Sequence, residues 1–262
     1  MRIAVIGGGP GGLYFGYFWK KRHPDAHIDL FEQNAAGATW GFGVVFSEQA
    51  LEFLRADDPD TVDAITPRME SWKNITLNLR GASVEIDGVG FSSIGRLELL
   101  GILQARAASV GVTPRYETQL TSVDQLAGYD LIVAADGLNS LVRRAFEGDF
   151  GTSLSYSANK FAWYGTTKRF ETLSQTFVKT GLGTFNAHHY RYSPGMSSSW
   201  SNAICRPGSV TALPTGRLMN PKPFASRCSP PPSMDIDSCR TSRCGGISRG
   251  SGTSAGRSRI WC

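Results

Sequence analysis

The chain has 262 residues, of which 41% are hydrophobic, and a formal net charge of +5. This apolar content suffices for a buried core, but no apolar stretch reaches the roughly 18 residues of a membrane-spanning helix and no signal peptide is recognisable, so we expect a cytoplasmic protein with no membrane partner. The first 196 residues carry −2 and the last 66 carry +7, so the basic balance belongs to the tail and does not indicate that the folded part binds nucleic acid.

The first 32 residues predict a β-α-β unit. Residues 2–6 and 27–32 are short apolar runs typical of buried strands. Residues 13–21 between them are apolar and aromatic with a basic end, which is typical of a helix. A strand, a helix and a second strand in this order imply a parallel sheet.

Further helices and strands are predicted between residue 32 and Met196. Ser47 is placed to cap a helix, and residues 75–79 and 83–86 alternate around a turn as in a hairpin. The other predicted elements are helices over 97–108 and 141–146 and strands over 131–135, 161–167, 176–179 and 185–192.

Regular periodicity stops after Met196. The last 66 residues contain 14 serines, seven prolines and all five cysteines. They include no run that predicts a helix or a strand, and this composition is typical of disorder.

A glycine-rich turn lies between the first strand and the first helix: Gly7-Gly8-Gly9-Pro10-Gly11-Gly12. In this spacing, Gly7 permits a tight turn, Gly9 lets the backbone approach a pyrophosphate, and Gly12 lets the helix pack on the strand. The N-terminus of the helix that follows offers free N–H groups and a partial positive charge to the phosphates, and we count Pro10 and Gly11 with the glycines as cofactor-binding residues. We interpret the turn as a dinucleotide-binding site; a purely structural glycine turn is the alternative.

Two acidic residues follow predicted strands and belong to the same hypothesis. Glu32 comes twenty residues after Gly12, where a carboxylate accepts hydrogen bonds from a pair of ribose hydroxyls. Asp136 and Gly137 follow the strand over 131–135. There the glycine allows a sharp exit from the strand, and the carboxylate is placed to receive hydrogen bonds near the phosphates. An ordinary strand-turn with a solvated aspartate is the alternative for the second pair.

The run Asp130-Leu-Ile-Val-Ala-Ala-Asp136-Gly137 resembles the Asp-Gly motif of single-component flavoprotein aromatic hydroxylases, the family typified by p-hydroxybenzoate hydroxylase. This resemblance implies that Asp136 and Gly137 lie near the FAD pyrophosphate and take part in NAD(P)H binding. Arg96 opens the long predicted helix and resembles a family arginine that contacts the FAD phosphates. An anionic ligand would explain a basic residue at a helix start, where the macrodipole disfavours it; a solvated arginine is the alternative.

Three further segments resemble salicylyl-CoA 5-hydroxylases and aminobenzoyl-CoA monooxygenases: residues 40–47, 159–166 and 185–190. A flavin hydroxylase of the violacein pathway, which acts on a tryptophan-derived indole, shares much of this pattern. The resemblance places the 40–47 loop against the flavin ring. We expect Trp163 and Tyr164 to pack within a sheet more than to touch substrate. His188 and His189 alternate on a strand, so at most one of them faces a pocket.

The resemblance implies an α/β fold with a Rossmann-like FAD-binding domain (1–156) and an incomplete β-rich substrate domain (157–196), and the composition of the tail (197–262) predicts disorder. It implies an enzyme that uses FAD, NAD(P)H and O2 to hydroxylate an aromatic small molecule, an aryl-CoA thioester such as salicylyl-CoA or aminobenzoyl-CoA. Because the flavin performs the oxygen chemistry, we nominate no catalytic side chain and no metal. The alternatives are an indole hydroxylase, an FAD oxidoreductase without oxygenation, and a non-enzymatic nucleotide-binding module.

The tail departs from the family after Met196. The family continues with a strand of the kind S-T-F-I-V-E-C-D, whereas residues 197–205 read S-S-S-W-S-N-A-I-C. These residues can be encoded by codons that, read one base earlier, give F-I-V-V-E-C-D, and residues 241–262 can be encoded by bases that give a second family-like segment in the same displaced frame. We therefore hypothesise a single-base frameshift near Ser197 and expect the chain as given to hydroxylate nothing. A genuine divergent tail, a zinc site built from the cysteines and an Arg/Ser-rich RNA-binding segment are the alternatives.

Overall fold

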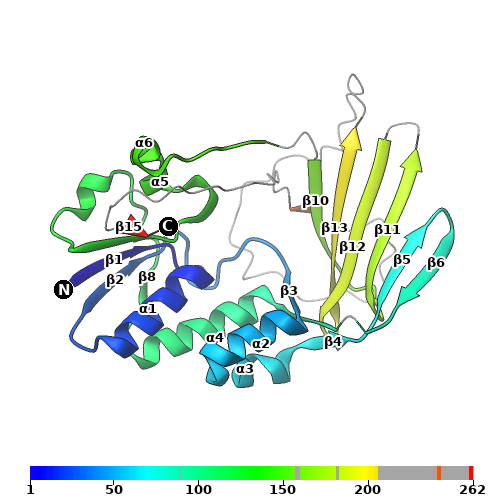
Figure 1. Ribbon diagram of the computed structural model, residues 1–262, viewed down its shortest axis with the longest axis horizontal. Coiled ribbons are helices and arrows are strands. Elements are labelled where there is room, and N and C mark those ends of the chain that lie inside the picture. Colours follow the sequence, from blue (N-terminus) through cyan, green and yellow to red (C-terminus); the bar gives the residue numbers. More distant parts are fainter. Residues whose placement is uncertain (89, 157–159, 181–182, 206–240, 243–259, 262) are drawn as a thin grey trace. The chain divides into compact units, whose positions relative to one another are not determined.

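A computed structural model describes residues 1–88, 90–156, 160–180, 183–205, 241–242 and 260–261, and the chain divides into two compact units (Figure 1). The first unit consists of Met1–Ala38, Leu100–Ser155 and Arg249–Cys262, and the second of Thr39–Leu99 and Tyr156–Ser248. The predicted disorder of residues 206–240 and 243–259 falls outside the described residues.

The first unit contains a parallel sheet of five strands in the order β15-β9-β1-β2-β8. The strands are β1 (Arg2–Ile6), β2 (His27–Phe31), β8 (Pro114–Arg115), β9 (Leu131–Ala134) and β15 (Ile260–Trp261). Its helical elements are α1 (Pro10–Arg22), η2 (Val123–Leu126), η3 (Gly137–Asn139), α5 (Leu141–Ala145), α6 (Glu147–Phe150) and most of α4 (Arg96–Ser109). The predicted β-α-β unit and its parallel sheet are therefore confirmed.

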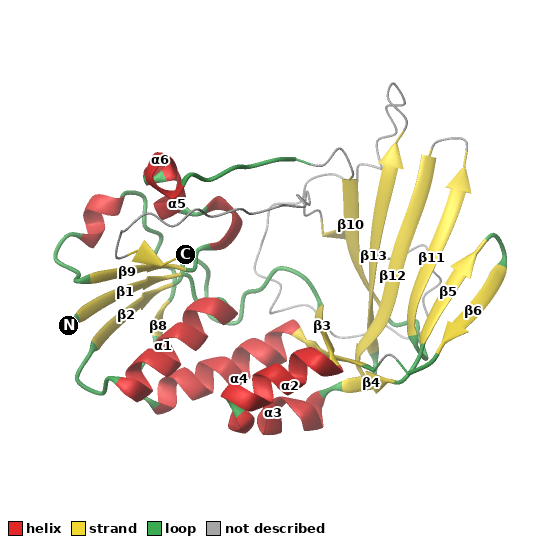
Figure 2. Cartoon of the chain, viewed as in Figure 1, coloured by secondary structure: helices red, strands yellow, loops and turns green. Residues whose placement is uncertain are grey.

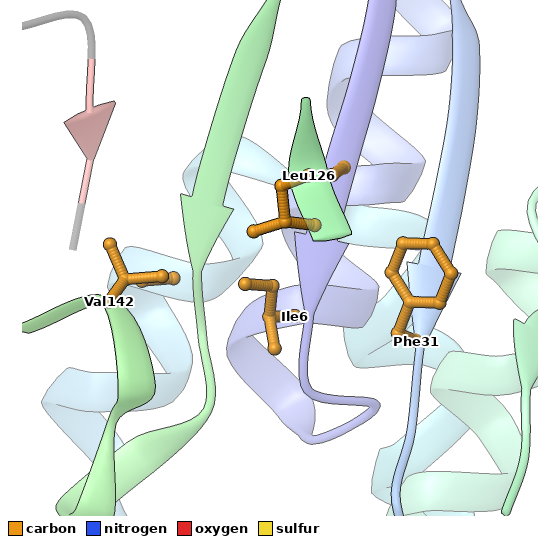
Figure 3. Packing of buried hydrophobic residues seen from close by; sticks show 6 residues of the cluster. Ile6, Phe31, Leu126 and Val142 are labelled. Carbon is orange, nitrogen blue, oxygen red and sulfur yellow. The ribbon is translucent and has the colours of Figure 1, made fainter. Parts of the chain in front are cut away.

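Side chains of β1 alternate between two apolar layers. Val5 lies beneath α1, because a Cβ atom added to Gly12 of that helix would come within 3.2 Å of Val5 Cγ1. Figure 3 shows the opposite layer, in which side chains from β1, β2, η2 and α5 meet: Ile6, Phe31, Leu126 and Val142. This apolar packing on both faces fixes the carboxyl ends of the central strands, where the glycine turn begins.

Asp29 is a buried charge on β2, with 4% of its surface exposed. Its carboxylate accepts a hydrogen bond from the Tyr129 hydroxyl at 2.7 Å and another from the Arg115 guanidinium, and His27 Nε2 lies 3.3 Å away. Burial alone would raise the pKa of Asp29, but the Tyr129 hydrogen bond and the charges of Arg115 and His27 outweigh it and lower the pKa.

The lowered pKa of Asp29 predicts acid-sensitive stability. A carboxyl group with a lower pKa in the folded state stabilises the protein above its unfolded pKa of about 4, and this contribution is lost as the pH falls through the folded pKa. We expect Asp29→Asn to lower the free energy of unfolding by about 1–3 kcal/mol at neutral pH and by less at about pH 3. Urea unfolding at both pH values measures this, and an equal loss at both would contradict the assignment.

The second unit contains two sheets, with strand orders β14-β10-β13-β12-β11-β5-β6 and β3-β7-β4 among the described residues (Figure 2). The strands of the larger sheet are β5 (Ile75–Leu79), β6 (Ala82–Ile86), β10 (Lys160–Thr166), β11 (Leu173–Thr180), β12 (Gly183–Ser193), β13 (Met196–Cys205) and β14 (Thr241–Ser242). The remaining elements are β3 (Gly43–Ser47), α2 (Glu48–Asp57), α3 (Pro59–Ile65), η1 (Thr66–Arg68), β4 (Glu70–Trp72) and β7 (Phe91–Gly95).

Local signals predicted several of these elements correctly. The Ser47 hydroxyl caps α2 by accepting the Ala50 N–H at 3.2 Å. The hairpin of β5 and β6 turns at Arg80 and Gly81, whose φ angles of 54° and 81° suit a tight two-residue turn. None of the helices in the described ranges is long and apolar enough to cross a membrane.

Strand β13 corrects the prediction that regular structure ends at Met196. It extends to Cys205 and pairs antiparallel with β10 on one side and β12 on the other. The segment lacks apolar alternation, so its strand character comes from main-chain pairing with two neighbours. The small side chains of Ser197 and Ser198, 1% and 0% exposed, fit the crowded centre of this sheet.

Candidate cofactor-binding site

The glycine turn connects β1 to α1 through two positions that only glycine fits. Gly7 has a φ of +105°, and a Cβ atom there would lie 2.3 Å from the Ala135 carbonyl oxygen. A Cβ atom on Gly12 would lie 2.0 Å from the carbonyl oxygen of Gly7. The turn is therefore tight because the backbones of β1, α1 and the segment after β9 approach one another closely.

The start of α1 is open and has no negative charge of its own. The helix begins at Pro10, Gly9 provides no side-chain cap, and the first turn contains no acidic residue. Cβ atoms added to Gly9 or Gly11 would meet nothing within 4 Å. Free N–H groups and the positive end of the helix dipole therefore face an open space, an arrangement that suits a phosphate anion.

Glu32 lies beside this turn at the end of β2. One carboxylate oxygen, Oε2, accepts the Gly8 N–H at 2.8 Å. The other, Oε1, accepts both the main-chain N–H and the side-chain Nδ2 of Asn34 at 2.7 Å. The carboxylate is thus held next to the glycine turn by three donors. The hydrogen bonds of Gly8 and Asn34 to this carboxylate were not predicted, because they depend on the conformation of the turn and of the loop after β2, which leaves no periodic signal.

Asp136 and Gly137 meet the glycine turn from the end of β9. A Cβ atom on Gly7 would lie 3.0 Å from the Asp136 main-chain nitrogen, and Gly137 has a φ of +72°. Asp136 Oδ2 accepts the Leu141 N–H at 2.6 Å. Asp136 Oδ1 is buried without a hydrogen-bond partner among the described residues. A buried acceptor is costly without a donor, so a ligand hydroxyl would satisfy it.

Arg96 belongs to the second unit. Its main-chain N–H donates to the Phe42 carbonyl at 2.8 Å, and its side-chain Nε donates to the Thr39 hydroxyl at 2.9 Å. The structure brings the other predicted residues together around Gly7 in the first unit. A contact between Arg96 and a phosphate stays a prediction.

The structure corrects the predicted 40–47 loop, because residues 43–47 form strand β3 and only the residues before it form a loop, which interlocks with β10 inside the second unit. A Cβ atom on Gly41, whose φ is +100°, would lie 2.5 Å from the Trp163 ring. In return, a Cβ atom on Gly165 would lie 2.6 Å from the Phe42 ring. The Trp163 indole N–H also donates to the Ser198 hydroxyl. Trp163 thus packs the loop onto the sheet, as its sequence context predicted.

His188 and His189 have different neighbours, as alternation along β12 requires. His188 Nε2 lies 3.1 Å from Gln175 Nε2, and its ring lies 5.2 Å from the Trp200 ring. His189 stacks on Phe170 at 4.6 Å. Burial lowers the pKa of both imidazoles, so neutral rings are favoured.

Among the described residues, no group of three or more His, Cys, Asp or Glu side chains is arranged to hold a metal ion. The zinc hypothesis depends on cysteines of the tail, and most of these fall outside the described residues.

Comparison with known proteins gives named relatives but no matching family model. Salicyloyl-CoA 5-hydroxylase of a Streptomyces species is 36% identical over 211 residues, which cover 78% of this chain and 41% of that protein. A 3-hydroxy-4-methyl-anthranilyl-(aryl-carrier protein) 5-monooxygenase of Streptosporangium sibiricum is 33% identical over 199 residues, or 76% of this chain and 56% of that protein. Protodeoxyviolaceinate monooxygenase of Chromobacterium violaceum is 32% identical over 208 residues, which cover 76% of this chain and 54% of that protein. The chain spans about half the length of these relatives.

Solved structures share the fold at low sequence identity. A 2-methyl-3-hydroxypyridine-5-carboxylic acid oxygenase has a TM-score of 0.64 at 17% identity, covering 78% of this chain and 58% of that one. CtdE in complex with FAD has a TM-score of 0.58 at 16% identity, and the match covers 81% of this chain and 61% of that one. Along three quarters of its own length the chain is therefore similar to three proteins that are named as a hydroxylase and two monooxygenases, and it shares its fold with these two solved structures.

Proposed function

We propose that the protein is, by descent, an FAD-dependent monooxygenase that uses NAD(P)H and O2 to hydroxylate an aromatic ring carried as a thioester. The observation that carries this proposal is the meeting of the glycine turn, Glu32 and Asp136 at one edge of a parallel sheet, in a chain 36% identical to a salicyloyl-CoA 5-hydroxylase. Dinucleotides bind at this edge in related α/β folds. We expect the reaction to take place in the cytoplasm.

The residues of the first unit fit FAD. The open start of α1, from Gly9 to Gly12, would hold the pyrophosphate through main-chain N–H groups. Glu32 would accept hydrogen bonds from ribose hydroxyls, and the buried Oδ1 of Asp136 would accept one from another hydroxyl of the cofactor. Bound FAD would supply the redox chemistry that links NAD(P)H, O2 and the ring. The side chains of this chain bind and orient, and we assign none of them as a nucleophile or an acid–base group.

The names of the relatives support a thioester substrate. The Streptomyces relative is named for salicyloyl-CoA, and the Streptosporangium relative for an anthranilyl group on a carrier protein. Both names describe an aromatic acid bound through its carboxyl group. The Chromobacterium relative, at 32% identity, is named for protodeoxyviolaceinate and not for a thioester.

We also propose that residues from Ser197 onward are read in a displaced frame, and that the chain as given does not hydroxylate. β13 supplies main-chain pairing over 197–205, although these residues do not contain the F-I-V run of the family strand. Sequencing the gene around the Met196 codon tests this directly. An intact frame encoding the same tail would show the frameshift hypothesis to be wrong.

A one-base correction after the Met196 codon tests the function itself. We expect the corrected protein, loaded with FAD, to convert salicyloyl-CoA or anthraniloyl-CoA to a hydroxylated product in an NAD(P)H- and O2-dependent reaction, measured by mass spectrometry with isotopically labelled O2. The uncorrected chain is the matched control and should form no product. NAD(P)H oxidation without label in any product, with either thioester or an indole substrate, would favour the oxidoreductase without oxygenation.

A further inference from the structure

The side chain of Asn34 makes a hydrogen bond to Glu32 in addition to the one that its main chain makes. Its Nδ2 donates to Glu32 Oε1 at 2.7 Å, and the main-chain N–H of Asn34 donates to the same oxygen at the same distance. Because Gly8 occupies the other carboxylate oxygen, the amide completes a set of donors that fixes the plane of the Glu32 carboxylate.

The backbone around these residues is held independently of the Asn34 side chain. The Glu32 N–H donates to the Arg115 carbonyl at 2.9 Å, and the Glu32 carbonyl accepts the Thr118 N–H at 2.9 Å. The Asn34 carbonyl accepts the Glu117 N–H at 3.1 Å. Replacing the Asn34 side chain should therefore leave the loop backbone in place. Only the rotation of the Glu32 carboxylate and the charge beside it should change.

We propose that Asn34 is a positioning residue for adenosine binding: its amide orients the Glu32 carboxylate so that Oε2, which already accepts the Gly8 N–H, also faces a ribose hydroxyl. The inference rests on the proposed FAD site. An acceptor fixed before the ligand arrives pays no ordering cost on binding, whereas a carboxylate free to rotate does. A hydrogen bond to a charged group is the kind of contact whose loss weakens binding by about tenfold.

Two substitutions distinguish a role of Asn34 in orienting the Glu32 carboxylate from a role in stabilising the fold. Asn34→Ala removes the donor and should weaken FAD binding about tenfold at every pH. Asn34→Asp keeps the shape but sets a second carboxylate against Glu32. Two carboxylates in contact repel each other, so binding at about pH 8 should be weaker than in Asn34→Ala. Acid relieves this repulsion, so affinity should recover several-fold at about pH 5. No such recovery is expected for the wild-type chain or for Asn34→Ala.

The chain provides a matched control in Asn74, whose Nδ2 donates to Glu85 Oε1 at the same 2.7 Å in the second unit. Asn74→Asp makes the same chemical change at a pair that is not among the predicted cofactor-binding residues, and it should leave the Kd for FAD unchanged. Circular dichroism and thermal unfolding of each variant establish that it is folded.

The measurement is the Kd of the full chain and its variants for FAD, from flavin fluorescence, and for ADP, from calorimetry. Wild-type affinity for FAD in both folded Asn34 variants, or an equal loss in both at the two pH values, would overturn the role of Asn34 while leaving the FAD site intact. Binding of ADP with the expected Asn34 pattern, but no binding of FAD, would support the role of Asn34 and contradict the proposed cofactor. A folded wild-type chain that binds neither ligand would overturn both.

Discussion

Gly12→Ala is expected to lower the free energy of unfolding of the first unit by about 3 kcal/mol. A Cβ atom at this position would lie 2.0 Å from the Gly7 carbonyl oxygen, which is main chain and has no rotamer with which to move aside. Relief requires α1 to shift away from β1, and this also opens the apolar contact with Val5. Urea unfolding followed by far-ultraviolet circular dichroism measures the loss.

Two neighbouring glycines provide the controls, because Cβ atoms on Gly9 and Gly11 meet nothing within 4 Å. Gly11→Ala should change stability by less than about 1 kcal/mol, since alanine favours a helix over glycine. Gly9→Ala should fold equally well but bind FAD more weakly, because the added methyl group would occupy the space proposed for the pyrophosphate. Unchanged stability of Gly12→Ala would contradict the close packing of the turn.

Arg191→Met is expected to destabilise the second unit by about 3–5 kcal/mol, because it removes the cation of a buried ion pair and leaves the anion in place. The guanidinium, whose side chain is 9% exposed, donates to Glu70 at 3.0 Å, to the Phe170 carbonyl at 2.7 Å and to Glu171 at 3.2 Å. It also lies 5.8 Å from the ring centroid of Trp72. Methionine fills similar volume but leaves the Glu70 carboxylate, 20% exposed, without its cation.

Arg169 is the matched control for this change, because it pairs with Glu171 at 3.1 Å on the surface, with side chains 62% and 74% exposed. Arg169→Met should cost less than about 1 kcal/mol, as expected for a solvated pair. Thermal and urea unfolding of both variants gives the comparison. Similar losses for Arg191→Met and Arg169→Met would show that the buried network contributes no more than a surface contact.

The first unit was largely predictable because its signals are local. Apolar runs at β1 and β2, the glycine spacing and the position of Glu32 each follow from the geometry of a β-α-β unit. Helix α1 nevertheless begins at Pro10, before the apolar residues from which it was predicted, because proline fits the first helical turn.

The second unit was less predictable because its strands depend on partners distant in sequence. β7 includes Ser92 and Ser93, which are 8% and 0% exposed, and β13 begins with buried serines, so neither strand has the apolar pattern of a buried element. No change of composition marks residues 39 or 99, where the chain passes from one unit to the other. The contact of Asn34 with Glu32 in the first unit was missed for a different reason: the two residues are close in sequence, but their contact depends on the conformation of the loop.

Titration of the purified full chain with FAD tests most directly whether the edge formed by the glycine turn, Glu32 and Asp136 is a flavin site. Quenching of flavin fluorescence and the visible absorption of the bound flavin report the stoichiometry. We predict one FAD per chain, with binding weakened in Gly9→Ala and in Asn34→Ala and unchanged in Asn74→Asp. A chain that unfolds cooperatively, and is therefore folded, but leaves the fluorescence of added FAD unchanged would contradict the proposed site.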